Sequence, residues 1–158
     1  MTATITPISP DSAEAQALIA ELTAETAALY PPENRYGYSA ERLLKESVAF
    51  FLIRENGIPA GCAGVKLVGS EYAEVKRMYV RPQFRGLGLA QMMLDHLAGY
   101  ARSHGIEILR LETGIYQHAA IRLYERVGFQ PIPPFGEYKA SKLNRFYEKR
   151  LDGWPSGG

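Results

Sequence analysis

The sequence predicts an α+β fold, in which a mixed, mostly antiparallel sheet of six or seven strands carries helices on both faces. In the first half, three strand-like runs separated by tight turn signals predict an antiparallel meander. In the second half, runs with helical periodicity alternate with strand-like runs and predict helices that pack on the same sheet. The 158 residues suit a single domain, expected at 1–152 and followed by a flexible tail at 153–158.

The first half opens with a helical region and continues as a meander. Apolar residues at helical spacing favour the first helix, and a Pro-Pro pair ends it. Asn56-Gly57 is a strong hairpin signal, and Gly61 and Gly64 mark bulges or close approaches in the following strand. The expected elements are a strand at 4–8, a helix capped by Ser9 or Asp11 and ending at Leu29, an aromatic loop at 33–38, a helix at 40–46 capped by Ser39, and strands at 48–54, 58–68 and 72–80.

The second half alternates helices and strands. An apolar stripe from Ala90 to Ala101 favours a long helix, and Gly105 suits the left-handed residue that closes it. The expected elements are a glycine-bearing loop at 83–88, a helix to about His104, a strand at 106–112, a helix at 117–126, a short strand after Gly128-Phe129 and a last strand at 145–151. The last strand could pair across a homodimer or lie inside the sheet with a charged outer face.

Composition and charge exclude several classes of protein. A net charge of +1 provides no basic field for nucleic acid, and no apolar run approaches the roughly 20 residues of a membrane span. The N-terminus lacks the pattern of a secretory signal. The single cysteine, Cys62, reads as a structural thiol, and His96, His104 and His118 fit no metal-ligand spacing. We therefore expect a soluble, cytoplasmic protein without a metal, a nucleic-acid partner or a membrane partner.

The strongest chemical signal lies in residues 77–94, RMYVRPQFRGLGLAQMML, where a strand runs through a glycine turn into a helix. The first turn of a helix presents unpaired N–H groups and a partial positive charge, so an anion such as a pyrophosphate can bind there. Gly86 and Gly88 would admit the phosphate to the backbone, and Arg85 adds a positive charge. The loop lacks the Gly-Lys-Ser/Thr of a Walker A motif and, with Gln91, the third glycine of a dinucleotide fingerprint. On the two glycines alone, a tight turn without a ligand is an equal alternative.

Two motifs in the right order resemble the GNAT family of N-acetyltransferases. The first, Gln83-x-x-Gly86-x-Gly88, matches the Q/R-x-x-G-x-G/A signature and follows a segment similar to the family's fourth strand, Met78-Tyr79-Val80-Arg81-Pro82. The second is similar to N-x-x-A-x-x-L-Y-x-x-x-G-F and reads Gln117-x-x-Ala120-x-x-Leu123-Tyr124-x-x-x-Gly128-Phe129. The resemblance covers residues 48–150 and includes features of a bacterial small-molecule branch. Gln117 replaces the usual Asn, keeping the amide and adding one methylene.

The resemblance implies an acyl-CoA N-acyltransferase fold and an enzyme that moves an acetyl group from acetyl-CoA to a primary amine of a small molecule, by direct attack in a ternary complex. A backbone N–H near Tyr79 or Val80 would polarise the thioester carbonyl. The residues implied to hold acetyl-CoA, with coenzyme A as product, are Met78, Tyr79, Val80, Gln83, Arg85, Gly86, Leu87, Gly88, Leu89, Ala90, Gln117, Ala120 and Tyr124.

The resemblance also implies catalytic groups. Tyr124 corresponds to the tyrosine often placed near the sulfur and is the expected general acid, because a phenol of pKa about 10 can donate to a thiolate of about 8.5. The alternative is a core aromatic. Glu74 is the expected base, on the strand face that period two gives to Val80. Its alternative is pairing with Lys76, and Glu112 or a water chain are other possible bases.

The aromatic loop would cover the acceptor pocket in a family-like fold. Arg35 could bind a substrate carboxylate by a bidentate pair, while Tyr36 and Tyr38 could line the pocket or simply pack against the helices. Tyr138 would close the other wall. A protein lysine or N-terminal acetyltransferase and a non-catalytic acyl-CoA sensor remain alternative functions, because one fold hosts many of them.

Overall fold

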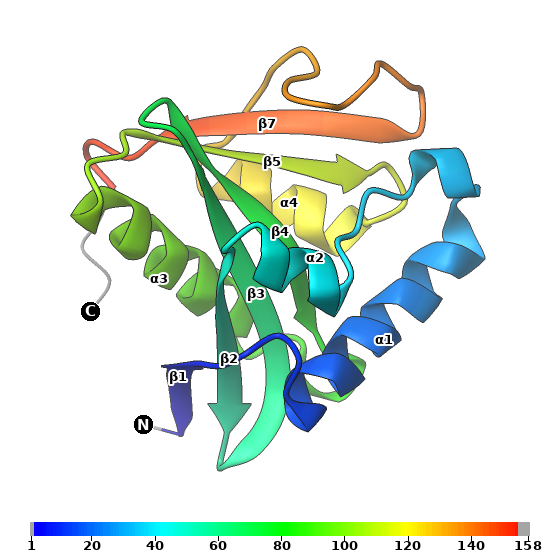
Figure 1. Cartoon of the computed structure of the whole chain (residues 1–158), viewed down its shortest axis with the longest axis vertical. Coiled ribbons are helices and arrows are strands. Elements are labelled where there is room, and N and C mark those ends of the chain that lie inside the picture. The colour runs from blue at the N-terminus through cyan, green and yellow to red at the C-terminus, as the bar shows by residue number, and fades with distance from the viewer. Residues whose placement is uncertain (1, 155–158) are drawn as a thin grey trace.

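The computed structural model describes residues 2–154 (Figure 1). Its helices are α1 (Ala13–Leu29), η1 (Pro32–Asn34), α2 (Ala40–Lys45), η2 (Pro82–Phe84), α3 (Leu89–Ser103) and α4 (His118–Arg126), where η marks a 3₁₀ helix. Its strands are β1 (Ala3–Pro7), β2 (Ala49–Glu55), β3 (Ile58–Val68), β4 (Tyr72–Val80), β5 (Ile108–Gly114), β6 (Gln130–Pro131) and β7 (Asn144–Arg150).

The strands of the described part form one sheet in the order β1-β2-β3-β4-β5-β7-β6. All neighbouring pairs are antiparallel except β4 and β5, which confirms the predicted mixed, mostly antiparallel sheet. The last strand was expected either inside the sheet or at a homodimer contact, and β7 lies inside the sheet. β5 pairs with one edge of β7 along its whole length, and β6 pairs with Tyr147 and Glu148 on the other edge of β7.

Each face of the sheet has its own apolar core. α3 and α4 cover one face, where Leu94, Leu97 and Leu109 are fully buried. α1 and α2 cover the other face around Leu18 and Leu43 (Figure 1). The sheet therefore separates two helical layers, as the alternation of periodicities predicts, and any opening in the sheet connects them.

The sheet opens between β4 and β5. These strands pair only at Ala73–Leu109 and Glu74–Arg110 and separate beyond that point. β4 carries a bulge there, because β3 advances two residues from Cys62 to Gly64 while β4 advances three, and the extra residue, Arg77, has a φ of 51°. A bulge bends its strand away from the regular ladder, so it helps to hold the gap open.

Most predicted elements are confirmed, with small shifts at their ends. Ser12, rather than Ser9 or Asp11, caps α1, and its Oγ accepts the N–H of Ala15 at 3.3 Å. Ser9 and Asp11 instead bond to each other at 2.5 Å. β5 starts two residues later than predicted, since Ile106 donates its N–H to Ala101 and so belongs to the turn that closes α3.

The glycines in β3 lie where the predicted close approaches are found. A Cβ at Gly61 would collide with the carbonyl of Tyr79, and one at Gly64 would lie 2.7 Å from Cγ1 of Val48. A side chain at Gly61 would therefore require the backbone of β4 to move, and one at Gly64 would require the side chains of Val48 and Phe50 to shift. Among the described helices, none combines the length and the apolar character that a membrane crossing requires.

The predicted tail at 153–158 includes Trp154, which packs against the domain. This side chain is only 5% exposed, its Nε1 donates to Asp95 at 2.9 Å, and its ring packs edge-on against Phe129. The indole completes the core on the α3 face, so Trp154 belongs to the packed domain. The rest of the predicted tail, residues 155–158, lies outside the described residues.

Candidate active site

Two neighbouring cavities occupy the region where β4 and β5 separate. The larger, of about 600 Å³, runs along the starts of α3 and α4 and is called the groove here. The smaller, of about 130 Å³, lies beneath the loop at 34–38 and is called the inner pocket. The two share the lining residues Leu22, Met78, Gln117, Ala120 and Tyr124. Tyr124 thus stands on the boundary between a long groove and a small pocket.

The turn before α3 forms one end of the groove. Gly86 and Gly88 have φ values of 83° and 78°, and nothing lies within 4 Å of the position a Cβ would take at either residue. Gly88 occupies the N-cap of α3 without any side-chain cap, so the first N–H groups of the helix stay available. This open cradle suits a phosphate-bearing group.

Guanidinium groups add positive charge to the groove. Arg85 lines it, although Nε donates to the carbonyl of Val80 at 2.9 Å and Nη2 pairs with Glu25 at 3.1 Å. Arg122 and Arg126 of α4 also line it. The sequence analysis did not single out these two, although their i, i+4 spacing on one helix face was the available signal.

The structure brings nearly all the predicted cofactor residues together. Only Gln83 and Leu87 do not line the groove, since both side chains are exposed on the turn. The residues that do are Met78, Tyr79, Val80, Arg85, Gly86, Gly88, Leu89, Ala90, Gln117, Ala120 and Tyr124.

Gln117 connects α4 to α1. Its Oε1 accepts the hydroxyl of Tyr30 at 3.3 Å, and its Nε2 donates to Glu25 at 3.3 Å. The same Tyr30 hydroxyl accepts the N–H of Tyr116 at 2.9 Å. The glutamine side chain therefore spans the groove and holds its two walls in register.

Tyr124 is a buried phenol that reaches both cavities. Burial, and then the charge of Glu112, raise the pKa of Tyr124 well above its ordinary value of 10. Its ring lies 5.6 Å from that of Phe129, so it is also a core aromatic. The phenol stays protonated throughout the neutral range and can donate a proton.

Glu112 of β5 lines the inner pocket. Burial raises the pKa of Glu112 to about 7; a hydrogen bond from Asn144 and the charge of Lys76 oppose this shift, and Glu74 adds to it. Nδ2 of Asn144 donates to Oε2 of Glu112 at 2.8 Å. A carboxyl group that ionises near neutrality can accept a proton at physiological pH.

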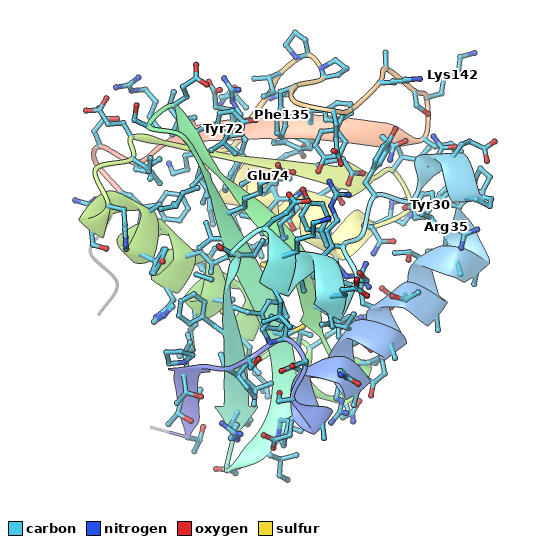
Figure 2. All side chains as sticks on the ribbon, in the orientation of Figure 1. Tyr30, Arg35, Tyr72, Glu74, Phe135 and Lys142 are labelled. Carbon is cyan, nitrogen blue, oxygen red and sulfur yellow. The ribbon has the colours of Figure 1, made fainter. Side chains whose placement is uncertain are left out.

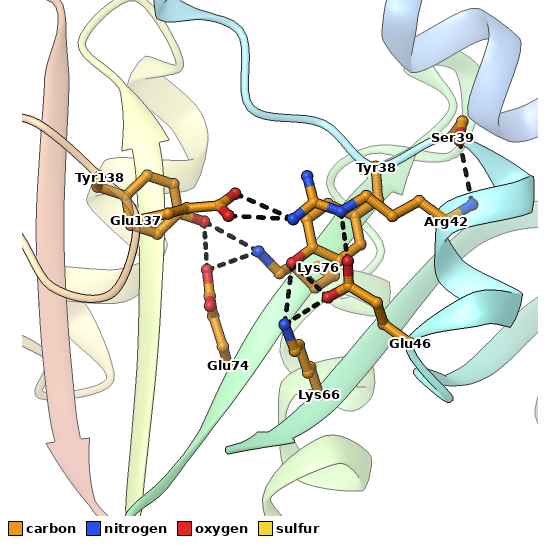
Figure 3. A network of polar contacts seen from close by, with 9 residues as sticks. All are labelled: Tyr38, Ser39, Arg42, Glu46, Lys66, Glu74, Lys76, Glu137 and Tyr138. Carbon is orange, nitrogen blue, oxygen red and sulfur yellow. Dashed lines mark hydrogen bonds and ion pairs between the residues drawn. The ribbon is translucent and has the colours of Figure 1, made fainter.

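Glu74 and Val80 lie on opposite faces of the sheet, so the prediction of a shared face is wrong. The extra residue in the β4 bulge reverses the alternation of side chains. Val80 packs toward the α3 core, whereas Glu74 points to the α2 side and is 5% exposed. There it forms an ion pair with Lys76 at 2.9 Å and accepts the hydroxyl of Tyr138 (Figure 3). Glu74 lines neither cavity.

The predicted acceptor residues Arg35, Tyr36 and Tyr38 all line the inner pocket. Arg35 is exposed on the loop that follows α1 (Figure 2). Tyr36 meets Tyr138 edge-to-face, with ring centroids 4.8 Å apart. Tyr38 is 2% exposed and also serves packing, because its ring lies between the charged groups of Arg42 and Lys76 (Figure 3). The loop thus forms the roof of the pocket.

Neither the cysteine nor the histidines form a reactive cluster. Cys62 is 1% exposed, and burial raises the pKa of its thiol to about 12, so it is protonated and inert, as expected. Within residues 2–154, no group of three histidine, cysteine or acidic side chains could hold a metal ion.

Comparison with known proteins gives consistent matches. The profile of the Acetyltransferase (GNAT) family matches residues 15–129. An IAA acetyltransferase of Azospirillum brasilense is 37% identical over 135 residues, which cover 85% of this chain and 88% of the relative. A crystal structure from Klebsiella pneumoniae, assigned as an acyl-CoA N-acyltransferase, is 39% identical with a TM-score of 0.80, and covers 94% of this chain and 97% of its own. A GNAT acetyltransferase from Elizabethkingia anophelis, solved with acetyl-CoA bound, shares the fold at a TM-score of 0.70 and 15% identity, over 94% of this chain and 98% of its own.

Proposed function

Because this chain belongs to the GNAT family of acetyltransferases, with acetyl-CoA as cosubstrate, we propose that it acetylates the primary amine of a small molecule by direct attack in a ternary complex. The observation that carries the proposal is the position of Tyr124. It lies between a groove that fits coenzyme A and a small pocket that holds a neutral-range carboxyl group.

The groove has the features that the cosubstrate requires. The open cradle at Gly86 and Gly88 and the free N–H groups of α3 suit the pyrophosphate, and Arg122 and Arg126 offer further phosphate partners. The backbone of Met78–Val80 lines the path from the cradle to Tyr124, where the arm would lie. Acetyl-CoA supplies an activated thioester at the boundary of the two cavities.

Three protein groups then perform the transfer. Glu112 takes a proton from the ammonium group, directly or through water, and the freed amine forms a C–N bond with the acetyl carbon. A backbone N–H of the Met78–Val80 segment stabilises the carbonyl oxygen as it gains charge. Tyr124 donates its proton to the sulfur as the C–S bond breaks, and its phenolate then takes the second proton from the nitrogen that becomes the amide. The products are the N-acetyl amine and coenzyme A.

Two carboxylates compete for the role of base, and the geometry favours Glu112. Its carboxyl group lines the inner pocket and has a pKa of about 7. Glu74 is engaged by Lys76 and Tyr138 and lines neither cavity. A direct catalytic role for Glu74 stays a prediction, and its ion pair gives it a simpler role in holding Lys76.

The small volume of the inner pocket supports a small acceptor over a protein chain. Tyr36 of its roof contacts Tyr138, which also lines the pocket, and next to this contact Arg42 forms an ion pair with Glu137 at 3.0 Å. A protein substrate would require these contacts to open. Homodimer formation and a cytoplasmic location stay predictions.

The test is a thermal-shift titration with acetyl-CoA, followed by a thiol-release screen over amino acids, polyamines and aminoglycosides. We expect a rise in melting temperature and thiol release with one amine class. A rise without release from any small amine would favour a protein substrate or a sensor. Absence of any rise would contradict the cosubstrate site.

A further inference from the structure

The inner pocket carries more positive than negative charge. Its charged lining residues are Arg35, Lys76, Arg77 and Glu112. Lys76 is neutralised by its ion pair with Glu74. Within residues 2–154, neither Arg35 nor Arg77 has a carboxylate within 4.0 Å. Two arginines of the pocket lining therefore have no anionic partner within the described residues.

Arg77 is the more unusual of the two. It is the extra residue of the β4 bulge, and its positive φ of 51° is strained for a residue with a side chain. Nη2 donates to the carbonyl of Ile19 at 3.0 Å and to the hydroxyl of Thr23, which are both neutral. Nε is buried and has no hydrogen-bond partner. The guanidinium is thus fixed at one edge and unsatisfied at the other.

An unpaired cation in a partly buried place is unfavourable unless an anion joins it. Consistent with this, burial lowers the pKa of Arg77. Glu112 does not serve as the partner, because it lies on β5 and bonds to Asn144 instead. Gly37 keeps the roof close to the guanidinium, since a Cβ there would collide with Nη1. A small anion that enters from the inner pocket would supply the partner that the Arg77 guanidinium lacks.

We propose that Arg77, assisted by Arg35, binds the carboxylate of the acceptor, so that the substrate is an amino acid and not a simple amine. The inference rests on the proposed acetyl transfer. The β4 side of the pocket would hold the carboxylate, while Glu112 on β5 and Tyr124 on α4 would receive the amino group. A cavity of about 130 Å³ suits a carboxylate better than a bulky phosphate ester.

The charge pattern thus matches a small zwitterion. Arg77 immediately precedes Met78, which lines both cavities, so a carboxylate on Arg77 keeps the rest of a short substrate near the boundary. A polyamine or an aminoglycoside would place additional positive charge beside two guanidinium groups that lack an anionic partner, and this repulsion disfavours both classes.

The experiment compares amino acids with their neutral amides. Glycine, β-alanine, L-methionine and L-phenylalanine are each paired with the matching carboxamide, and rates are compared on the pH-independent plateau of each amine. We expect kcat/KM to be roughly 10- to 100-fold higher for the acid of at least one pair, mainly through KM, as charge-assisted hydrogen bonds require. Arg77→Met should abolish this preference while keeping turnover of the amide, and Arg77→Lys should keep part of it.

Thr23→Val is the matched control. It removes a neutral contact of Arg77 with α1 but keeps the guanidinium, so the preference for the acid should survive. Equal turnover of acids and amides by the unmodified enzyme would overturn the inference. So would an Arg77→Met variant that loses acid and amide turnover equally, because that result indicates a structural role.

Failure of the proposed function would look different, with acetyl-CoA binding but no thiol release from any amine. The carboxylate site is then decided by calorimetry, with L-methionine and L-methioninamide titrated into the protein saturated with coenzyme A. Binding of the acid alone, lost in Arg77→Met, supports the site. Equal binding of both probes, or no binding of either, refutes it.

Discussion

Burial gives Tyr124 and Glu112 opposite tasks. The phenol keeps its proton far above neutral pH, while the carboxyl group loses its proton near pH 7. One side chain can therefore donate and the other accept under the same conditions. Tyr124 lies on α4 and Glu112 on β5, and both line the inner pocket. A single substrate in that pocket can therefore contact the proton donor and the proton acceptor.

Removal of the Tyr124 hydroxyl should slow the chemical step. Tyr124→Phe should lower kcat about 10-fold or more, because the thiolate loses its proton donor, and should leave acetyl-CoA affinity unchanged. Steady-state kinetics and calorimetry measure the two quantities. Tyr147→Phe is the control, since this buried hydroxyl bonds to Glu125 and lines neither the groove nor the inner pocket. Unaltered kcat across the pH range would exclude Tyr124 from the mechanism.

The pH–rate profile should report Glu112. As the base, it acts when ionised, so kcat should rise with pH through about 7 and then level. The hydrogen bond from Asn144 stabilises the ionised form of Glu112 and lowers its pKa. Asn144→Leu removes this bond, so the pKa should increase and the rise of kcat should move to higher pH. The other charged groups that influence the pKa of Glu112 are Glu74 and Lys76 of β4, and Glu112 in turn raises the pKa values of Tyr124, Tyr30 and Tyr138. If the rise of kcat with pH stays at the same pH in Asn144→Leu and is retained in Glu112→Gln, the ionisation that causes it belongs to another group.

Glu112 should also make stability depend on pH. Its pKa in the folded state lies above the reference value of 4.5, so its contribution to stability is full below pH 4.5 and is lost as pH rises through about 7. Glu112→Gln does not ionise and avoids this loss. The melting temperature of the variant relative to the parent should therefore increase between pH 5 and pH 8. A difference that stays constant with pH would contradict the raised pKa.

At the level of elements, the turn before α3 is the proposed phosphate cradle. Gly86→Glu should weaken acetyl-CoA binding by 10-fold or more, because a carboxylate would occupy the cradle and repel the pyrophosphate. Gly69→Glu is the control, since Gly69 also has a positive φ and open space around it but lies in the β3–β4 turn. Calorimetry should show reduced affinity only in the first variant. Equal affinities would mean that the cofactor binds elsewhere.

The strands and helices were predictable because local signals specify them. Asn56-Gly57 and Gly105 fix turns through backbone conformation, and alternating periodicities identify the elements between them. The β4 bulge was not predictable in this way. The residue types of the strand give no sign that Arg77 is an extra residue. The bulge nevertheless moves every side chain before it to the opposite face of the sheet, and the predicted face of Glu74 was wrong for this reason.

At the level of the whole molecule, the site depends on contacts between distant segments. The residues predicted to hold the cofactor follow a local motif, and most of them line one groove. The hydrogen bond from Nδ2 of Asn144 to Glu112 joins β7 to β5. Oδ1 of Asn144 also accepts a hydrogen bond from Nδ2 of Asn34 at 2.8 Å. The partners lie 32 and 110 residues apart in the chain, and no periodicity relates them. The sequence alone therefore left several candidate bases, and the proposal of Glu112 depends on contacts that only the fold reveals.

The C-terminal segment should stabilise the domain without shaping the site. Trp154 bonds to Asp95, accepts Arg102 at its carbonyl and packs against Phe129, and it lines neither cavity. Trp154→Ala should lower the free energy of unfolding by about 3–5 kcal/mol, the usual cost of removing a buried tryptophan side chain, and leave acetyl-CoA affinity unchanged. Trp154→Phe should cost less, since it keeps an aromatic ring and loses the bond to Asp95. Denaturant unfolding and calorimetry test both variants, and a loss below 1 kcal/mol in Trp154→Ala would place the end of the domain before Trp154.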